Sequence, residues 1–561
     1  MQSGENFCER RFYTSVVFIC SLYALLAGLY IARTPLVMDE FQGAYLVSRL
    51  EHELPYRDFR PYKNVLGYYL QAIPLKWSHS TWQGLMSIKF ATLGVNIVAI
   101  LSAAHLLAKR FRRTAVCFGT LMFVVMTTFL ERSAVLRVDM LTAWFGLFSL
   151  LFLLDRRFLV AGLLAGLSFL VSQKGIYYSG ATAVALGGHW ALAQRDRQAF
   201  AQGVTFATAS IAVFLAYLAF WTWHSSLEQV IAHMFLSHGK IAFGNLYNIR
   251  HFWWQTLSRN PVFYGLAAAG VWTLLRREPE ESTQEPANSA SDPPGSFDQR
   301  RLLATYGLVL LACCVWHKQP WPYFFVLLIP TCYVMIVVFL DSEWRVPRWP
   351  PLAIKLAIGM ATLLPLIRVP HVLQRSNATQ HQNIAWAESL LGENDNYFAG
   401  MRLLLRHPHA LHELAWLDEP RRRELREQSE DEQLHLVAKF DAACPKVVIW
   451  NYRLDELDGA LRTFLEEHYR PWRGNVWVYQ EPLAGRTTVD IRFAGGYRLV
   501  GPPTAIARID GKDYIATDTI PLEPGEHTVS SELGTHLVYA PAAGESPLPK
   551  PDSLFTNPYS Y

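Results

Sequence analysis

Long apolar runs recur through the first two thirds of the chain, and they constrain its fold more than any other feature. A helix needs about 20 mainly apolar residues to cross the hydrocarbon core of a bilayer, and we count about eleven runs that approach this length. Because an unpaired backbone is costly in lipid, such runs indicate helices rather than isolated strands. They centre near residues 23, 97, 122, 147, 165, 184, 212, 268, 309, 331 and 359. The sequence therefore predicts a polytopic α-helical membrane protein.

The first run, residues 14–31, follows Arg10 and Arg11 and resembles a signal peptide in outline. It lacks a small-residue cleavage site, because Ile31 and Ala32 lead into Arg33 and a proline. We interpret it as an uncleaved first transmembrane helix.

The distribution of basic residues predicts the orientation, because cytoplasmic loops are enriched in Lys and Arg. A cytoplasmic N-terminus places the following basic segments inside: residues 109–113, 155–157, 195–197, 276–301 and 341–348. The longest of these is rich in Pro, Ser and Glu, which predicts a disordered linker. An odd number of spans then places everything after about residue 370 on the extracytoplasmic side.

The tail has a soluble pattern and divides once more. Residues 371–482 read as an α/β region, with strands at 446–450 and 476–479 and a helix at 457–469. Residues 483–561 alternate as short strands, with a hairpin-type Asp510–Gly511 turn. We therefore predict a transmembrane domain over residues 1–370, an extracytoplasmic α/β domain, and a small β-sandwich-like module.

Several functional classes have no motif in this sequence. A glycine loop of the Walker type is absent, so ATP-driven transport has no support. The seven cysteines form neither a disulfide framework nor a pair with metal-site spacing. We predict membrane lipid as a partner and no nucleic acid, and no cofactor is assigned; a transiently bound divalent metal stays open.

The first predicted outer loop carries two unusual groups of charges. Asp39 and Glu40 follow the first span directly. They are either catalytic acids or acids that favour the start of a short helix. Further on, Arg57, Arg60 and Lys63 break the charge rule for an outer loop. Cations beside tyrosines at the edge of an apolar surface suit a lipid-borne phosphate, and anchoring at the membrane interface is the alternative.

Two further outer turns place ionisable residues at membrane depth, namely Arg137 with Asp139, and Lys174 between two apolar runs. Such residues are expensive in lipid and are usually functional. Lys174 also has the alternative of reaching the interface with its long side chain. A third turn, with His317, Lys318 and Tyr323, sets a cation beside aromatic rings.

The order and sidedness of these motifs resemble the GT-C membrane glycosyltransferases, over about residues 10–370. The nearest branch is the bacterial protein O-mannosyltransferase and aminoarabinose-transferase superfamily. The resemblance lies in Asp39–Glu40 after the first span, in residues 56–63 before a Tyr-Tyr element, and in Arg137-Val138-Asp139. The stretches 161–175 and 321–330 agree with it.

The resemblance implies an inverting enzyme of the bacterial inner or plasma membrane. Such an enzyme takes sugar from a polyprenyl-phosphate carrier and passes it to a hydroxyl of a glycan, lipid or protein. It implies Asp39 as the general base, with Glu40 and Asp139 orienting the acceptor or the cations. Lys63 would meet the donor phosphate first, with Arg137, Lys174, Arg57 and Arg60 as further candidates. Related enzymes often carry Lys-Pro-Pro where this chain has Lys63-Asn64-Val65.

Two other classes compete with this interpretation. A multi-span lipid or solute transporter, or flippase, would use the charges to line a path, but it would place them near mid-membrane and in repeated halves. A non-enzymatic scaffold that presents the outer tail would leave Asp39, Lys63 and Lys174 without a role.

Overall fold

The computed structural model describes two compact parts of the chain. It describes residues 2–192, 197–236, 251–276, 299–317, 321–483 and 485–539 (without 503, 517, 532 and 533), together with Leu554. The membrane unit comprises Met1–Thr34, Arg49–Lys76 and Met86–Arg375. The C-terminal unit comprises Pro35–Ser48, Trp77–Leu85 and Ser376–Tyr561. The predicted linker within 276–301 lies mostly outside the described residues.

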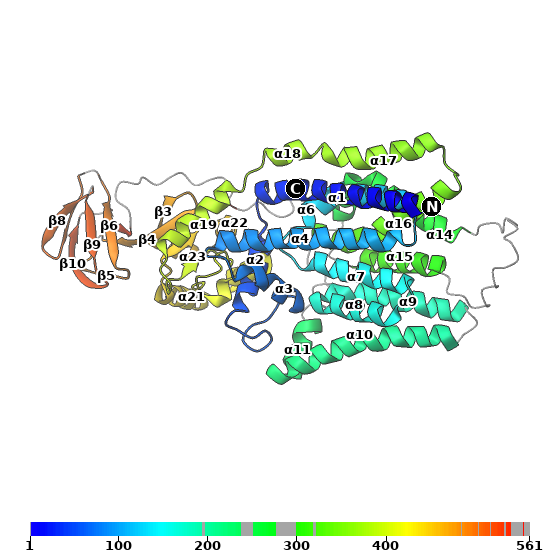
Figure 1. The fold of residues 1–561 in the computed structure, drawn as a ribbon. Coiled ribbons are helices and arrows are strands. Elements are labelled where there is room, and N and C mark those ends of the chain that lie inside the picture. Colours follow the sequence, from blue (N-terminus) through cyan, green and yellow to red (C-terminus); the bar gives the residue numbers. More distant parts are fainter. Residues whose placement is uncertain are drawn as a thin grey trace, which may run out of the picture. The chain divides into compact units, whose positions relative to one another are not determined.

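The membrane unit is built from apolar helices, whose long members run alongside one another (Figure 1). Every predicted centre falls within a helix of the structure. These helices are α1 (Gln2–Arg33), α4 (Thr81–Ala108), α5 (Arg113–Val125), α7 (Asp139–Leu154), α8 (Phe158–Val171), α9 (Ile176–Leu192), α10 (Arg197–His224), α14 (Pro261–Leu275), α15 (Gln299–Trp316), α16 (Ile329–Arg345) and α17 (Pro351–Leu366).

Among the described residues, four helical segments are by themselves long and apolar enough to cross a bilayer. They are Glu9–Arg33, Thr81–Ala108, Arg197–His224 and Pro351–Leu373. Only 11% of the most apolar window of α10 is buried, and Trp223 at its end is 87% exposed. Exposed apolar surface on this scale is typical of a helix that faces lipid or another protein. The number of eleven spans and the side of each terminus stay predictions.

Short helices connect the long ones and carry many of the predicted site residues. They are α2 (Met38–Arg49), α3 (Leu66–Leu75), α6 (Thr127–Arg132), η1 (Gln173–Gly175), α11 (Leu227–Ile231), η2 (Ala232–Leu236), α13 (His251–Arg259), η3 (Pro322–Leu327) and α18 (Val369–Leu373).

Glycine allows α8 and α10 to pack at very close range. A Cβ atom at Gly162 would lie 2.3 Å from the carbonyl oxygen of Phe206, and one at Gly166 would lie 2.8 Å from the Cβ of Val213. Small residues let membrane helices approach backbone to backbone, where dispersion contacts hold them together. The Gly162–Gly166 spacing fixes the position of α8, and with it the turn that carries Lys174.

The C-terminal unit combines helices with strands, as the sequence predicts for the tail. Its first part holds α19 (Ala378–Leu390), β1 (Tyr397–Phe398), η4 (His412–Leu414), α20 (Glu419–Glu427), α21 (Glu430–Ala443), β2 (Val447–Ile449), α22 (Tyr452–Asp455), α23 (Ala460–His468), β3 (Tyr469–Arg473) and β4 (Val476–Pro482). Its second part holds β5 (Thr488–Ile491), β6 (Gly495–Val500), β7 (Ile506–Ile509), β8 (Lys512–Ile515), β9 (Thr519–Leu522), β10 (Gly525–Ser531) and β11 (His536–Tyr539).

These strands form two sheets, which Figure 1 shows in yellow to red. One has the order β1-β2-β4-β11-β6-β9 with β3 beside β4, and the other has the order β5-β10-β7-β8. The predicted Asp510–Gly511 turn joins β7 to β8, and both of its residues have positive φ, as a tight two-residue hairpin requires. Because β11 pairs with β4, the larger sheet continues across residue 482. The three-domain division and the sandwich packing stay predictions.

The C-terminal unit also includes the segment that carries Asp39. The side-chain amide of Gln380 on α19 bonds both backbone groups of Leu36, at 2.8 and 2.9 Å. In the same way Thr81 donates its backbone N–H to Glu388, and its hydroxyl oxygen accepts the N–H of Leu405. Two segments that lie before residue 90 in the sequence are therefore anchored on the tail.

Candidate functional site

A buried carboxylate with two cations bonded to it lies within the membrane unit. Lys174 Nζ donates to Asp139 Oδ1 at 2.6 Å, and Arg137 Nε donates to Asp139 Oδ2 at 2.9 Å. The Asp139 side chain is 2% exposed, against 10% for Arg137 and 12% for Lys174. Lys63 is also buried and lies near enough to act electrostatically on Asp139. We call Lys63, Arg137, Asp139 and Lys174 the cation cluster.

Local structure explains how the cluster forms. Asp139 is the first residue of α7, where a carboxylate suits the positive end of the helix. Lys174 lies on η1, whose start is capped by the Ser172 side chain. A Cβ atom at Gly175 would lie 2.4 Å from the backbone of α8, so glycine is what lets this turn fold back tightly. The turn then brings Lys174 beside an acid 35 positions earlier in the chain.

An aromatic wall covers the two cations. The guanidinium carbon of Arg137 lies 3.4 Å from the centre of the Tyr323 ring, and Lys174 Nζ lies 5.1 Å from it. His317 stacks on Phe324 at 4.3 Å and is hydrogen-bonded through Nδ1 to the Tyr177 hydroxyl. The negative faces of these rings stabilise cations that burial would otherwise disfavour. Thus Tyr323 contacts the cation cluster directly, and His317 stacks on a neighbouring ring of the aromatic wall.

The loop before α3 holds Lys63 in place. Tyr56, in the left-handed region at φ 66°, shares a 2.7 Å hydrogen bond between hydroxyl groups with Tyr217 of α10. The Tyr217 hydroxyl oxygen also accepts the N–H of Val65, and the Asn64 amide donates to the carbonyl of Phe169. Asn64 and Val65 therefore fix the loop beside Lys63 to α8 and α10.

The cluster gathers three cations around one carboxylate. Three cations and one carboxylate give it a formal charge of 3 − 1 = +2, within a site where every member is largely buried. The arrangement therefore suits an anion, and phosphate oxygens are the usual partners of such groups.

The other predicted residues have different surroundings. Arg57 and Arg60 are exposed, and Arg57 pairs with its neighbour Asp58 at 2.8 Å. Lys318 lies outside the described residues. Asp39 and Glu40 belong to the C-terminal unit.

Asp39 and Glu40 lie in the first turn of α2 and differ in burial. The Glu40 carboxylate is 2% exposed and accepts the backbone N–H of Val37 at 3.0 Å. This bond holds the chain as it enters the helix, which is a structural task. Asp39 is half-buried, so it keeps access to small molecules. Of the two acids, Asp39 is the more exposed.

A second group of arginines was not predicted from the sequence as a group. Glu131 pairs with Arg259 at 2.9 Å, and both side chains are 13% exposed. Arg132, Arg368 and Arg375 lie near enough to act electrostatically on Arg259. Glu131 and Arg132 lie at the end of α6 and Arg259 ends α13, while Arg368 and Arg375 flank α18. Only their place near the ends of apolar runs signals them in the sequence.

In the part of the chain that the structure describes, no group of three or more His, Cys, Asp or Glu is arranged to hold a metal ion. The transiently bound divalent metal and the catalytic roles of individual residues stay predictions.

Comparison with solved structures shows that the chain has a known fold. One similar structure is that of ArnT from Cupriavidus metallidurans bound to undecaprenyl phosphate, with a TM-score of 0.53. The two sequences are 13% identical, and the match covers 70% of this chain and 85% of the ArnT chain. Its apo structure gives a TM-score of 0.50. The apo oligosaccharyltransferase from Archaeoglobus fulgidus, 12% identical, covers 90% of this chain and 74% of its own at a TM-score of 0.50.

The chain has a GT-C-like fold. Both neighbours are membrane glycosyltransferases of the GT-C superfamily, so the resemblance predicted from the sequence is confirmed at the level of the fold. With its apolar helices, the chain is an integral membrane protein. No family model and no curated protein matches the sequence. At 12–13% identity, substrates and catalytic roles do not carry over from the neighbours.

Proposed function

We propose that this protein is an inverting glycosyltransferase that uses a polyprenyl-phosphate-linked sugar. It transfers the sugar to an acceptor hydroxyl on the extracytoplasmic face, with a cytoplasmic N-terminus and an extracytoplasmic tail. The observation that carries the proposal is the cation cluster, in which Arg137 and Lys174 bond Asp139 and lie against the Tyr323 ring, within a GT-C-like fold. One structure with this fold, ArnT, holds undecaprenyl phosphate, which is a lipid-borne phosphate of this class.

The chemistry requires negative charge to be met as it develops. When the bond between the anomeric carbon and the phosphate oxygen breaks, the bonding electrons stay with polyprenyl phosphate. Lys63, Arg137 and Lys174 are the candidates that stabilise this negative charge. Asp139 and Tyr323 hold Arg137 and Lys174 in place. Donors that are already oriented toward a developing charge are typically worth about 10²–10³ in rate each.

Asp39 is the proposed general base. It takes the proton of the acceptor hydroxyl as the acceptor oxygen attacks the anomeric carbon from the face opposite the phosphate, which inverts that centre. Transfer of a proton to a positioned carboxylate contributes about 10²–10⁴ in rate. The half-buried position of Asp39 and the fixation of its helix start by Glu40 support this assignment. Arg57 and Arg60, which are exposed, would act earlier by attracting the anionic carrier to the surface.

The test is sugar transfer by the purified full-length protein from a panel of radiolabelled polyprenyl-phosphate sugars. Wild type is compared with Asp39→Asn, which removes the base with little change in shape. Asp58→Asn is the matched control, because Asp58 is an exposed acid that pairs with Arg57.

Release of polyprenyl phosphate by wild type and Asp58→Asn, with a loss of about 10²-fold or more in folded Asp39→Asn, supports enzyme and base together. Transfer that survives in Asp39→Asn would show that another residue is the general base. No transfer from any donor by a folded protein would favour the transporter or flippase interpretation.

A further inference from the structure

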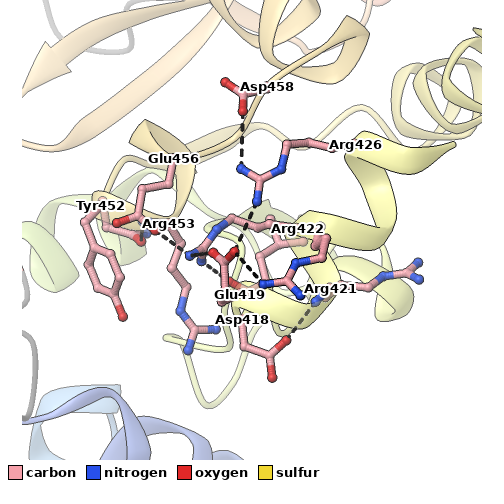
Figure 2. Close-up of polar contacts among 12 residues, drawn as sticks. Asp418, Glu419, Arg421, Arg422, Arg426, Tyr452, Arg453, Glu456 and Asp458 are labelled. Carbon is pink, nitrogen blue, oxygen red and sulfur yellow. Dashed lines mark hydrogen bonds and ion pairs between the residues drawn. The ribbon is translucent and has the colours of Figure 1, made fainter. Parts of the chain in front are cut away.

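Arg453 of the C-terminal unit is buried, and it has no carboxylate partner among the described residues. Arg453 on α22 is 3% exposed, and its Nε and Nη1 atoms make no hydrogen bond within the described residues. Nearby arginines have carboxylate partners: Arg422 pairs with Glu419 and Glu456, and Arg426 pairs with Glu419 and Asp458. Figure 2 shows the guanidinium of Arg453 pointing away from Asp458 and outside this ion-pair network.

The surroundings of Arg453 stabilise the cation only in part. Its guanidinium carbon lies 3.9 Å from the centre of the Trp416 ring, which meets one face of the group. The edge of a guanidinium carries five N–H donors, and a ring face satisfies none of them. A buried charge with unpaired donors is costly, so an anion supplied from outside the chain would remove that cost.

The same part of the C-terminal unit contacts the helix that carries Asp39. Tyr452, the neighbour of Arg453, directs its hydroxyl to the Sδ atom of Met38 at 2.6 Å. Arg402, next to the bridge between Met401 and Trp416, lies over the Tyr45 ring of α2 at 4.4 Å. Tyr452 and Arg402 therefore both touch α2, whose first turn holds Asp39.

We propose that Arg453, stacked on Trp416, binds an oxyanion of the acceptor, a phosphate or a carboxylate, and so presents the acceptor hydroxyl to Asp39. This assignment of the ligand as the acceptor rests on the proposed function. The donor phosphate has its own cations in the membrane unit, whereas Arg453 shares the C-terminal unit with the proposed base. Guanidinium is the side chain best suited to phosphate and carboxylate oxygens.

The test measures oxyanion binding without any sugar donor. Full-length protein in detergent is titrated with inorganic phosphate, and separately with phosphatidic acid in mixed micelles against diacylglycerol as a neutral control. Thermal unfolding reports binding, because a ligand that binds only the folded state raises the Tm in proportion to the logarithm of its concentration. The variants are Arg453→Met and Arg453→Lys.

Arg462→Met is the matched control. Arg462 also stacks on a tryptophan, at 4.5 Å from the Trp450 ring, but it is paired with Glu466 and with the carbonyl of Leu454. We expect the apparent affinity for the oxyanion to fall about tenfold or more in Arg453→Met and Arg453→Lys, and to be unchanged in Arg462→Met. Binding by the cation cluster is common to all these proteins and cancels in the comparison.

Stability without ligand gives a second, independent readout. Arg453→Met should be at least as stable as wild type, because it removes an uncompensated charge, while Arg462→Met should be less stable, because it breaks satisfied bonds. A response to phosphatidic acid alone would identify a lipid-borne group, and a response to both probes would identify the phosphate itself. Wild type that binds neither probe, or Arg453 variants that bind like wild type, would overturn the proposal.

The outcome is separable from that of the proposed function. Transfer that depends on Asp39, with no effect of Arg453 on oxyanion binding, would refute this site alone. Oxyanion binding that depends on Arg453, with no transfer from any donor, would refute the enzyme and leave an anion site on the C-terminal unit.

Discussion

The pair formed by Asp139 and Lys174 provides the sharpest test of the cation cluster. Two unit charges 2.6 Å apart attract by about 6 kcal/mol at an effective dielectric constant of about 20. Desolvation offsets part of this attraction, so the coupling energy should be about 1.5–4 kcal/mol. The perturbation is a double-mutant cycle with Asp139→Asn, Lys174→Met and the combined variant.

The assay is equilibrium unfolding of the full-length protein in mixed detergent and SDS micelles. Asp139→Asn alone should destabilise the protein by about 3–5 kcal/mol, because it leaves the buried cations without their carboxylate. Lys174→Met should cost less, because Arg137 still pairs with Asp139. In the combined variant the loss should be clearly smaller than the sum of the two single losses.

Arg57 and Asp58 form the control pair. Their charged atoms also lie at 2.8 Å, but the side chains are 55% and 31% exposed. Their coupling energy should stay below about 1 kcal/mol, because water and salt screen exposed pairs. A coupling between Asp139 and Lys174 no larger than that of the control pair would refute the view that these charges are buried and energetically joined.

Three further predictions concern the rate of transfer, helix packing and pH. Lys174→Met should lower the rate of sugar transfer about 10²–10³-fold at saturating donor, while Lys355→Met on the exposed face of α17 should leave the rate unchanged. Similar losses in both variants would argue against a specific role of Lys174. Gly162→Leu should separate α8 from α10 and cost several kcal/mol or prevent folding, whereas Gly359→Leu, with open space at its Cβ position, should be tolerated in the same unfolding assay. Burial lowers the pKa of His409 to about 3, below the usual value of about 6.5, so its contribution to stability is complete above pH 6.5 and is lost as the pH falls toward 3. His409→Gln should reduce the slope of unfolding free energy between pH 6 and 4 by up to about 1.4 kcal/mol per pH unit, while the exposed His435→Gln should not change it.

The sequence by itself determined the helices of the membrane unit. Apolar runs of nearly membrane length leave the backbone little choice, because every polar backbone group in lipid must be paired within its own helix. The same reasoning found the strands of the tail, where alternation and the Asp510–Gly511 turn are local signals. The sequence also indicated the candidate ionisable residues, because placing a charged side chain beside apolar runs costs free energy and is usually functional.

Only the tertiary structure decided which charges act together. Lys174 reaches Asp139 because Gly175 folds η1 against α8, and no local pattern encodes that distance in space. The basic residues of the first outer loop look equivalent in the sequence, yet Lys63 is buried near Asp139 and Arg57 is exposed beside Asp58. Arg453 lies among many arginines of the tail, and only packing shows that its Nε and Nη1 atoms find no hydrogen-bond partner in the part of the chain that the structure describes. Helix formation depends on neighbours along the chain, whereas the pairing of charges depends on contacts between segments far apart in the sequence.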